Sequence, residues 1–208
     1  MATALLEKPK VEMPEAAGMN ADPILYHWTA TAFNKAAEAN VFGPAERLEL
    51  VQGRIITIIG QGPRHATLAS AIAEMLREAF RQDSAIREEK PVRLGADSEP
   101  IPDIMVLNGR QADYADHQPV PEDVRLLVEV SVTTAEYDLG DKAIIYAQAG
   151  ISDYWVVLVN EVAIVRHRQP SSEGYQEVTR LVGTATLSPL AVPSAAWAIN
   201  TLLGREEE

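Results

Sequence analysis

Two apolar segments of this chain each hold an acidic residue where a buried β-strand is expected. Asp103 follows a proline and opens the segment Ile104–Leu107, while Glu129 lies inside the apolar run Leu126–Val132. A buried carboxylate is unfavourable unless it is paired, hydrogen-bonded or bound to a metal ion. If the two strands are neighbours in one sheet, Asp103 and Glu129 can converge on a single point at its edge.

The rest of the chain mixes strand and helix patterns, and it predicts an α+β fold in which a mixed β-sheet is flanked by two main helices. A length of 208 residues suits one domain over residues 26–204, preceded by a disordered tail, 1–25, and followed by an acidic tail, 205–208. We expect helices at about 29–40, 64–81 and 139–149, and a short last helix that Pro193 opens and that runs through Leu202. We expect strands at about 47–51, 54–59, 86–94, 102–108, 125–132, 153–160, 162–168 and 175–182.

The composition excludes several classes of site. The chain has no cysteine, so a disulfide scaffold, a thiol nucleophile and a cysteine-ligated zinc or iron–sulfur centre are ruled out. Its net charge of −12 argues against broad, sequence-blind binding to nucleic acid. No apolar run approaches the roughly 20 residues that span a bilayer, and no basic segment precedes the apolar stretch near Met1. We therefore expect a cytoplasmic protein with no membrane partner.

The strand acids have the chemistry of a metal site. Two carboxylates that leave room for water and phosphate oxygens are typical of Mg²⁺. Asp103 and Glu129 are the candidate ligands, and Glu49, which lies between Leu48 and Leu50, is a candidate third ligand. The alternative is structural, because a Pro-Asp pair is common, strand acids often face solvent, and the alternation around Glu49 permits that orientation.

Lys142 occupies an unusual place for a cation. Asp138 and Asp141 stand as the N-cap and first turn of the helix predicted at 139–149, where acids are favourable and a lysine is mildly unfavourable. One explanation is a surface ion pair between Asp138 and Lys142, four residues apart on the helix. The other is functional, because the helix follows Glu129 after a short loop and the ammonium can return to the carboxylates.

Seven short motifs occur in order along the chain, and together they are more specific than any one alone. They are Glu49-Leu-Val-Gln-Gly53-Arg, Gly62-Pro-Arg-His65, Pro102-Asp103, Val128-Glu129-Val-Ser131, Tyr137-Asp-Leu-Gly-Asp-Lys142, Tyr146-Ala-Gln-Ala-Gly150-Ile and Asp153-Tyr-Trp-Val-Val157. The series resembles the Uma-two-type family of putative restriction endonucleases, within the PD-(D/E)XK nuclease superfamily. The resemblance covers roughly residues 29–203.

This resemblance implies a restriction-endonuclease-like core in which acids on adjacent strands gather Mg²⁺, or Mn²⁺ in its place. By position, Asp103 is the acid of the Pro-Asp motif and Glu129 is the acid of the Glu-x-Lys motif. Ser131 stands where the superfamily has its lysine, and in this family the lysine has moved to the following helix, here Lys142. The expected catalytic residues are Asp103, Glu129 and Lys142, and the expected metal ligands are Asp103, Glu129 and Glu49.

The function expected of such a site is metal-dependent hydrolysis of DNA phosphodiester bonds. Arg64 and His65 open the helix at 64–81, where a phosphate binds well, so we expect them to bind substrate; capping or packing is the alternative role of His65. Six basic residues between 64 and 93 are interleaved with acids, which favours a solvated face over a DNA-facing patch. A homodimer with two sites would suit a duplex, by analogy alone.

Two other functions stay open. A catalytically silent nuclease-like domain would bind nucleic acid or a protein partner without cleavage, and a hydrolase of another phosphate ester would keep the metal and lose the DNA. Retention of Asp103, Glu129 and Lys142 favours catalysis over the silent domain. The acidity of the chain weakens the case for an enzyme that binds DNA freely.

Overall fold

The structure, a computed structural model, describes residues 25–43, 47–58, 62–81 and 84–205. The two predicted tails, 1–25 and 205–208, therefore lie almost wholly outside the described residues. The single domain expected over residues 26–204 stays a prediction. Within the described ranges, no helix is long and apolar enough to cross a membrane.

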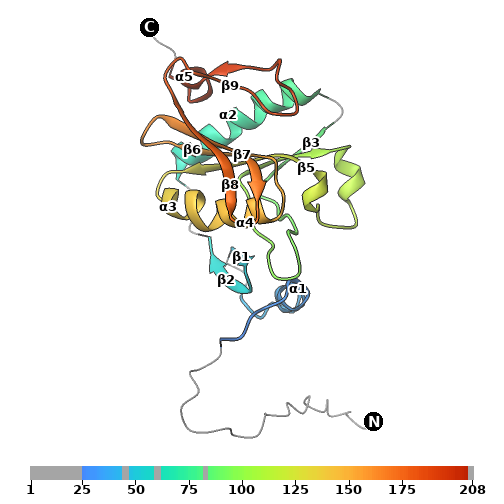
Figure 1. Cartoon of the computed structure of the whole chain (residues 1–208). Coiled ribbons are helices and arrows are strands. Elements are labelled where there is room, and N and C mark those ends of the chain that lie inside the picture. Colours follow the sequence, from blue (N-terminus) through green and yellow to red (C-terminus); the bar gives the residue numbers. More distant parts are fainter. Residues whose placement is uncertain (1–24, 44–46, 59–61, 82–83, 206–208) are drawn as a thin grey trace, which may run out of the picture.

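A six-stranded mixed sheet forms the centre of the molecule (Figure 1). Its order is β3-β4-β5-β6-β7-β8; β5 and β6 run parallel, and every other neighbouring pair runs antiparallel. The strands are β3 (Ser84–Glu88), β4 (Ile104–Asn108), β5 (Val124–Ser131), β6 (Asp153–Leu158), β7 (Ala163–Ser171) and β8 (Gly174–Val182). The predicted α+β class with a mixed sheet is confirmed.

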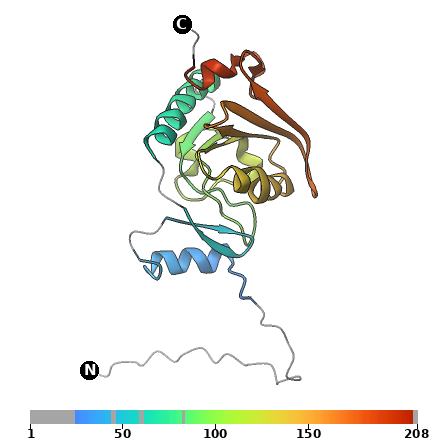
Figure 2. The ribbon, with the colours of Figure 1, turned by 90° about the vertical axis from the view of Figure 1, so that its left-hand side faces the viewer.

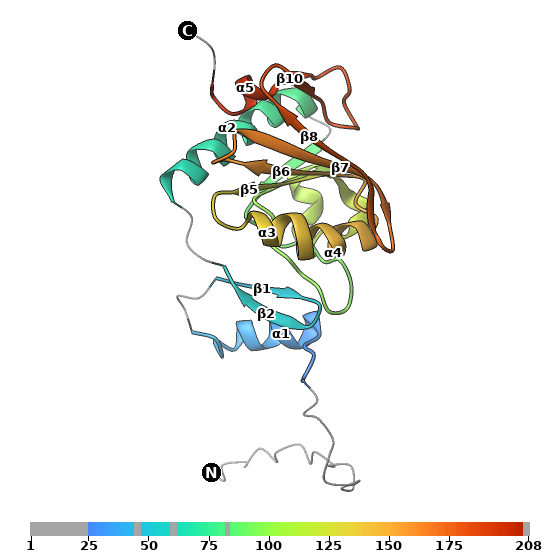
Figure 3. The same ribbon diagram turned by 60° about the vertical axis from the view of Figure 1, so that its left-hand side comes forward.

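Helices cover both faces of this sheet (Figures 1 and 3). One face packs against α2 (Pro63–Phe80), and the other packs against α3 (Ala135–Tyr137), a π-helical turn (Asp138–Lys142) and α4 (Ala143–Gln148). Side chains alternate along β5, so Leu126 and Val128 enter the core beneath α2 while Leu127 enters the core beneath α4. The same alternation places Glu129 on the α4 face.

A smaller group of elements, which we call the N-terminal lobe, lies beyond α4 (Figures 1 and 2). It consists of α1 (Ala30–Glu38) and the hairpin of β1 (Leu48–Val51) and β2 (Arg54–Thr57), all as predicted. Thr29 caps α1 by accepting a hydrogen bond from Ala32 N at 3.1 Å. The hairpin turn places Gln52 and Gly53 at φ values of 49° and 70°. Gly53 adopts this left-handed conformation without strain because it has no Cβ.

The strand predicted at 86–94 is wrong at its second half. β3 ends at Glu88, and Glu89 has a φ of 51°, which turns the chain out of the sheet. The segment after Glu89 runs to the N-terminal lobe, where Asp97 O accepts a hydrogen bond from Gly53 N at 2.8 Å. Val92 is fully buried in the core beneath α4 and Leu94 packs against that core, so the apolar residues that suggested a strand are buried without being part of one.

The last predicted helix is also wrong at its start. Trp197 and Ala198 form the short strand β10 (Trp197–Ala198), which pairs with β9 (Thr186–Leu187). The helix α5 is limited to Ile199–Leu202. Pairing with β9 overrides the start signal that Pro193 gives, because local propensity is weak against tertiary contacts.

Candidate functional site

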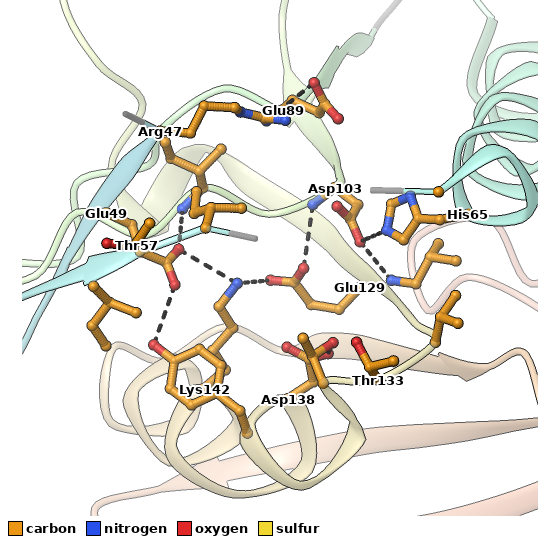
Figure 4. Close-up of a pocket in the computed structure, with 18 residues that line it drawn as sticks. Arg47, Glu49, Thr57, His65, Glu89, Asp103, Glu129, Thr133, Asp138 and Lys142 are labelled. Atoms are coloured by element: carbon orange, nitrogen blue, oxygen red, sulfur yellow. Dashed lines mark hydrogen bonds and ion pairs between the residues drawn. The ribbon is translucent and has the colours of Figure 1, made fainter. Parts of the chain in front are cut away.

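A pocket of about 360 Å³ lies where the N-terminal lobe, the first turn of α2, the ends of β4 and β5 and the π-helical turn meet (Figure 4). Its lining includes most of the polar residues that the sequence singled out. The polar lining residues are Arg47, Glu49, Thr57, His65, Glu89, Asp103, Glu129, Thr133, Thr134, Tyr137, Asp138 and Lys142.

The two predicted acids are neighbours in this pocket. Asp103 directly precedes β4, Glu129 lies in β5, and the register pairs Ile104 with Val128. Asp103 N donates to Glu129 Oε2 at 3.4 Å, and the exposed fractions of the two residues are 7% and 3%. The convergence expected from two neighbouring strands is therefore confirmed.

Asp103 is held by contacts from two directions. Its Oδ2 accepts a hydrogen bond from Val130 N at 2.7 Å, and His65 Nε2 lies 3.0 Å from the same oxygen. His65 is buried in the first turn of α2, and its other ring nitrogen, Nδ1, has no hydrogen-bond partner among the described residues. These contacts fix the orientation of the carboxylate.

Lys142 joins the acids, as the functional explanation of its position predicted. Its Nζ donates to Glu129 Oε1 at 3.0 Å and lies 3.4 Å from Glu49 Oε2. The residue is 6% exposed, so the alternative surface pair with Asp138 is wrong. Burial by itself would lower the pKa of Lys142, but the negative charges of Glu129 and Glu49 raise it further than burial lowers it, and the ammonium stays protonated.

The helix that carries Lys142 begins earlier than predicted. It starts at Ala135, so Asp138 is an interior residue and its predicted role as N-cap is wrong. The π-helical turn contains one extra residue, which brings Tyr137 and Lys142 together with the ammonium 5.6 Å from the ring centroid. Tyr146 follows four residues later on the same face.

Glu129 lies in an environment that opposes its negative charge. Besides Lys142, Tyr146 Oη donates to Glu129 Oε1 at 2.9 Å. Burial raises the pKa of Glu129 well above its usual value, the ammonium of Lys142 lowers it, and the charge of Asp103 raises it again. A further positive group beside Glu129 and Asp103 would therefore stabilise the ionised acids.

Glu49 reaches the pocket from β1, on the other side of Lys142 from Asp103 (Figure 4). Its Oε2 accepts a hydrogen bond from Ile101 N at 3.0 Å, and its Oε1 accepts one from Tyr137 Oη at 3.2 Å. The structure thus brings Glu49 against the ammonium and not against Asp103.

Arg64 is not brought together with the acids. It is exposed and lines a different surface pocket, between α2 and α5. Successive residues of an α-helix point about 100° apart, so a first turn that directs His65 inward directs Arg64 elsewhere.

Two further residues of the site, Tyr137 and Tyr146, were not assigned a role by the sequence, and Asp138 was assigned a different one. Tyr137 and Tyr146 donate to the two glutamates, and Asp138 accepts from Ser131 Oγ and Thr134 Oγ1, both at 2.6 Å. Burial raises the pKa of Asp138 above its usual value. The spacing of four between Lys142 and Tyr146 was the available signal, since it puts both on one helix face.

The donor set fits a Mg²⁺ ion with two protein ligands. In the described part of the chain, no group of three His, Cys, Asp or Glu side chains is arranged to hold a metal. Mg²⁺ is usually bound through one or two carboxylates and keeps several waters, however, so Asp103 and Glu129 suffice. Both line the same pocket and are hard oxygen donors.

Comparisons with known proteins identify the fold and the family. A putative nuclease of DUF820 from Anabaena variabilis, known from a crystal structure, has the same fold; its TM-score is 0.69 at 16% identity, over 86% of this chain and 98% of that chain. No curated protein matches the chain. The family model Uma2, described as putative restriction endonuclease, matches residues 32–201. Because this match spans most of the chain, the protein belongs to the Uma2 family of putative restriction endonucleases.

Proposed function

We propose that this protein is a Mg²⁺-dependent endonuclease that hydrolyses DNA phosphodiester bonds, with Asp103, Glu129 and Lys142 as its catalytic residues. The observation that carries the proposal is the meeting of these side chains in one pocket. Lys142 Nζ lies 3.0 Å from Glu129 Oε1, and Glu129 Oε2 lies 3.4 Å from Asp103 N. Membership of the Uma2 family supports the reaction class.

Asp103 and Glu129 would hold the Mg²⁺, or Mn²⁺ in its place, through carboxylate oxygens. When bound, the ion would lower the pKa of a water ligand and neutralise charge on the phosphoryl oxygens. His65 would act as a positioning residue, because its Nε2 lies 3.0 Å from Asp103 Oδ2.

Lys142 would provide a fixed positive charge beside the attacking water or the developing charge of the phosphoryl group. Glu49 contacts the ammonium at 3.4 Å and is itself held by Tyr137. We propose that Glu49 positions Lys142 in this way, and that it could serve as a metal ligand only after releasing the ammonium.

DNA is the substrate that the family assignment favours. The pocket itself is acidic, so a bound cation is needed before it can accept a phosphate. We further propose a cytoplasmic homodimer, since two copies of the site would suit the two strands of a duplex.

A catalytically silent nuclease-like domain is the second candidate. Lys142 forms an ion pair with Glu129 at 3.0 Å, and in the described residues no three His, Cys, Asp or Glu side chains are grouped to hold a metal. Such a domain would bind nucleic acid or a protein partner and leave the phosphodiester bond intact.

The test is incubation of supercoiled plasmid with the full chain in Mg²⁺ or Mn²⁺, and in EDTA. The parent is expected to convert the plasmid to nicked or linear forms only with metal. Asp103→Asn is expected to abolish this conversion. Asp141→Asn is the matched control, because Asp141 is one residue from Lys142 but is half exposed and pairs with Arg54 at 3.5 Å.

Binding of Mn²⁺, measured by calorimetry on the same proteins, separates the candidates. Metal binding without cleavage by the parent supports the silent domain. Equal Mn²⁺ affinity in the parent and in folded Asp103→Asn would contradict the proposed metal site.

A further inference from the structure

A second surface pocket, of about 620 Å³, lies where the loop at 114–120 meets β3, and we call it the arginine pocket. Its lining residues do not line the candidate active site. They are Arg87, Arg93, Tyr114, Ala115, Asp116, His117, Gln118 and Val120.

Arg87 has an incomplete environment in this pocket. The guanidinium is largely buried, and its Nε and Nη1 have no hydrogen-bond partner among the described residues. Within the same part of the chain, no carboxylate lies within ion-pair distance of it. A buried charge without a partner is strongly unfavourable. Among the described residues, the guanidinium of Arg87 therefore lacks both a counter-charge and hydrogen-bond partners for these two nitrogens.

Other half-buried arginines show what is missing. Arg93, Arg166 and Arg168 each pair with a carboxylate, those of Glu99, Glu177 and Asp153 respectively. Arg125 donates to Ser84 Oγ at 2.7 Å and lies over the Phe80 ring. Arg87 thus differs from each half-buried arginine in the described ranges.

The neighbours of Arg87 supply further polar groups. Gln118 has a buried amide oxygen with no hydrogen-bond partner among the described residues, and an amide can present its nitrogen instead by turning over. Arg93 and the exposed His117 line the same pocket, and Asp116 is the exposed acid on it. Because Arg93 is already paired with Glu99, the guanidinium of this pocket that has no ion pair among the described residues is that of Arg87, and together with an imidazole and an amide against one exposed carboxylate it favours an anionic ligand.

We propose that the arginine pocket binds an oxyanion of the phosphate class, with Arg87 as its principal ligand. A guanidinium matches such an oxyanion because its N–H groups donate to two oxygens at once. The phosphate has two possible sources, a free phosphate group and the backbone of a nucleic acid.

The second source rests on the proposed nuclease function, and the first does not. Arg87 lies two residues before Glu89, which lines the candidate active site. Two residues of chain span at most about 7 Å. A DNA strand seated at the active site would therefore pass close to the arginine pocket.

The first experiment titrates the full chain with inorganic phosphate in EDTA and follows the Nε–H signals of the arginine side chains by NMR. We expect a saturable shift of the Arg87 signal. Arg87→Gln is expected to weaken phosphate binding at least about tenfold, as for loss of a charge-assisted contact. Arg180→Gln is the matched control, since it removes an exposed charge on β8, and it should change binding less than about twofold.

An unshifted Arg87 signal at saturating phosphate, or equal affinity in Arg87→Gln and the parent, overturns the proposal. The NMR titration of the parent decides this even if Arg87→Gln does not fold. Cleavage plays no part in the measurement, so an inactive protein can still bind phosphate here.

The second experiment measures binding of an unphosphorylated DNA duplex in EDTA over a range of salt concentrations. If the backbone is the source, Arg87→Gln lowers the affinity and reduces the slope of log K against log salt by about one. If that slope is unchanged while phosphate binding is lost, the source is a free phosphate group.

Discussion

Glu129 and Asp153 are buried acids on the neighbouring parallel strands β5 and β6, and their environments differ. Each contacts a cation at 3.0 Å, Lys142 for Glu129 and Arg168 for Asp153. Burial raises the pKa of both carboxyl groups. Burial, a cation partner and a raised pKa are thus common to both acids, and none of the three distinguishes Glu129 from Asp153.

The difference lies in what surrounds each carboxylate. Asp153 is fully buried and also accepts from Trp155 Nε1 at 3.0 Å and Leu190 N at 2.7 Å, so protein groups satisfy it completely. Glu129 lines a pocket and has a second acid, Asp103, beside it. Access and a neighbouring acid, and not burial or the pKa shift alone, mark the candidate site.

The largest expected effect is on Glu129. Glu129→Gln keeps the side-chain size but removes a charged oxygen donor for the metal, and Lewis-acid stabilisation is worth several kcal/mol. We expect plasmid nicking to fall by about a thousandfold or more, with a smaller loss of the free energy of unfolding than at Asp153, because Lys142 keeps Glu49 at 3.4 Å. Nicking rates and urea unfolding measure the two quantities. If Glu129→Gln cleaved plasmid at the rate of the parent, Glu129 would be a structural acid like Asp153.

The opposite pattern is expected of Asp153. Asp153→Asn leaves Arg168, which is 15% exposed at its side chain, without its charge partner. Breaking a buried ion pair from one side typically destabilises by about 3 kcal/mol. Urea unfolding should show this loss, while the nicking rate per folded molecule stays that of the parent. A large fall in that rate would show that the two acids act together.

The next effect concerns the cation of the candidate site. Lys142→Met keeps an unbranched side chain and removes the charge, so we expect nicking to fall by about a hundredfold. The pKa of Glu129 should also rise, because the ammonium of Lys142 lowers it. Nicking measured against pH would then be displaced to higher pH in the variant. An unchanged rate and pH profile would assign Lys142 a structural role like that of Arg168.

The smallest effect is expected at His167, next to Arg168 on β7. Burial lowers the pKa of His167, so the unfolded chain takes up its proton first as the pH falls. Its contribution to stability is complete above the ordinary pKa of about 6.5 and is lost below it. His167→Phe, which keeps an aromatic ring beside Tyr154 and Tyr175, should lose less free energy of unfolding than the parent does as the pH falls from about 7.5 to about 5.5. If the free energies of unfolding of the parent and of His167→Phe changed by the same amount over this pH range, the prediction would be wrong.

The sheet and its acids could be predicted because the residue patterns that produce them lie within single short segments of the sequence. An acid inside an apolar strand must be compensated, and alternation fixes which face it takes, so Asp103 and Glu129 were identified. The position of Lys142 was identified as unfavourable for a surface helix, and the structure places its ammonium inside the pocket.

The missed features depend on contacts between distant parts of the chain. Glu49 and Tyr137 meet across 88 positions, and the excursion after Glu89 is fixed by bonds to the N-terminal lobe. Neither leaves a periodic trace in the sequence. The role of Asp138 was misread because an acid early in a helix also suits a cap.

The π-helical turn makes the candidate site depend on residue counting along a helix. Asp138, before its extra residue, and Lys142 with Tyr146, after it, all direct their side chains to the strand that carries Glu129 and Ser131. If the same number of residues formed an uninterrupted α-helix, the extra residue would rotate everything downstream by about 100°. The π-helical turn absorbs this rotation, so Asp138 on one side of it and Lys142 with Tyr146 on the other reach the same strand, and conversion of this turn to regular α-helix at the same chain length would separate the anchor at Asp138 from the lysine and tyrosine.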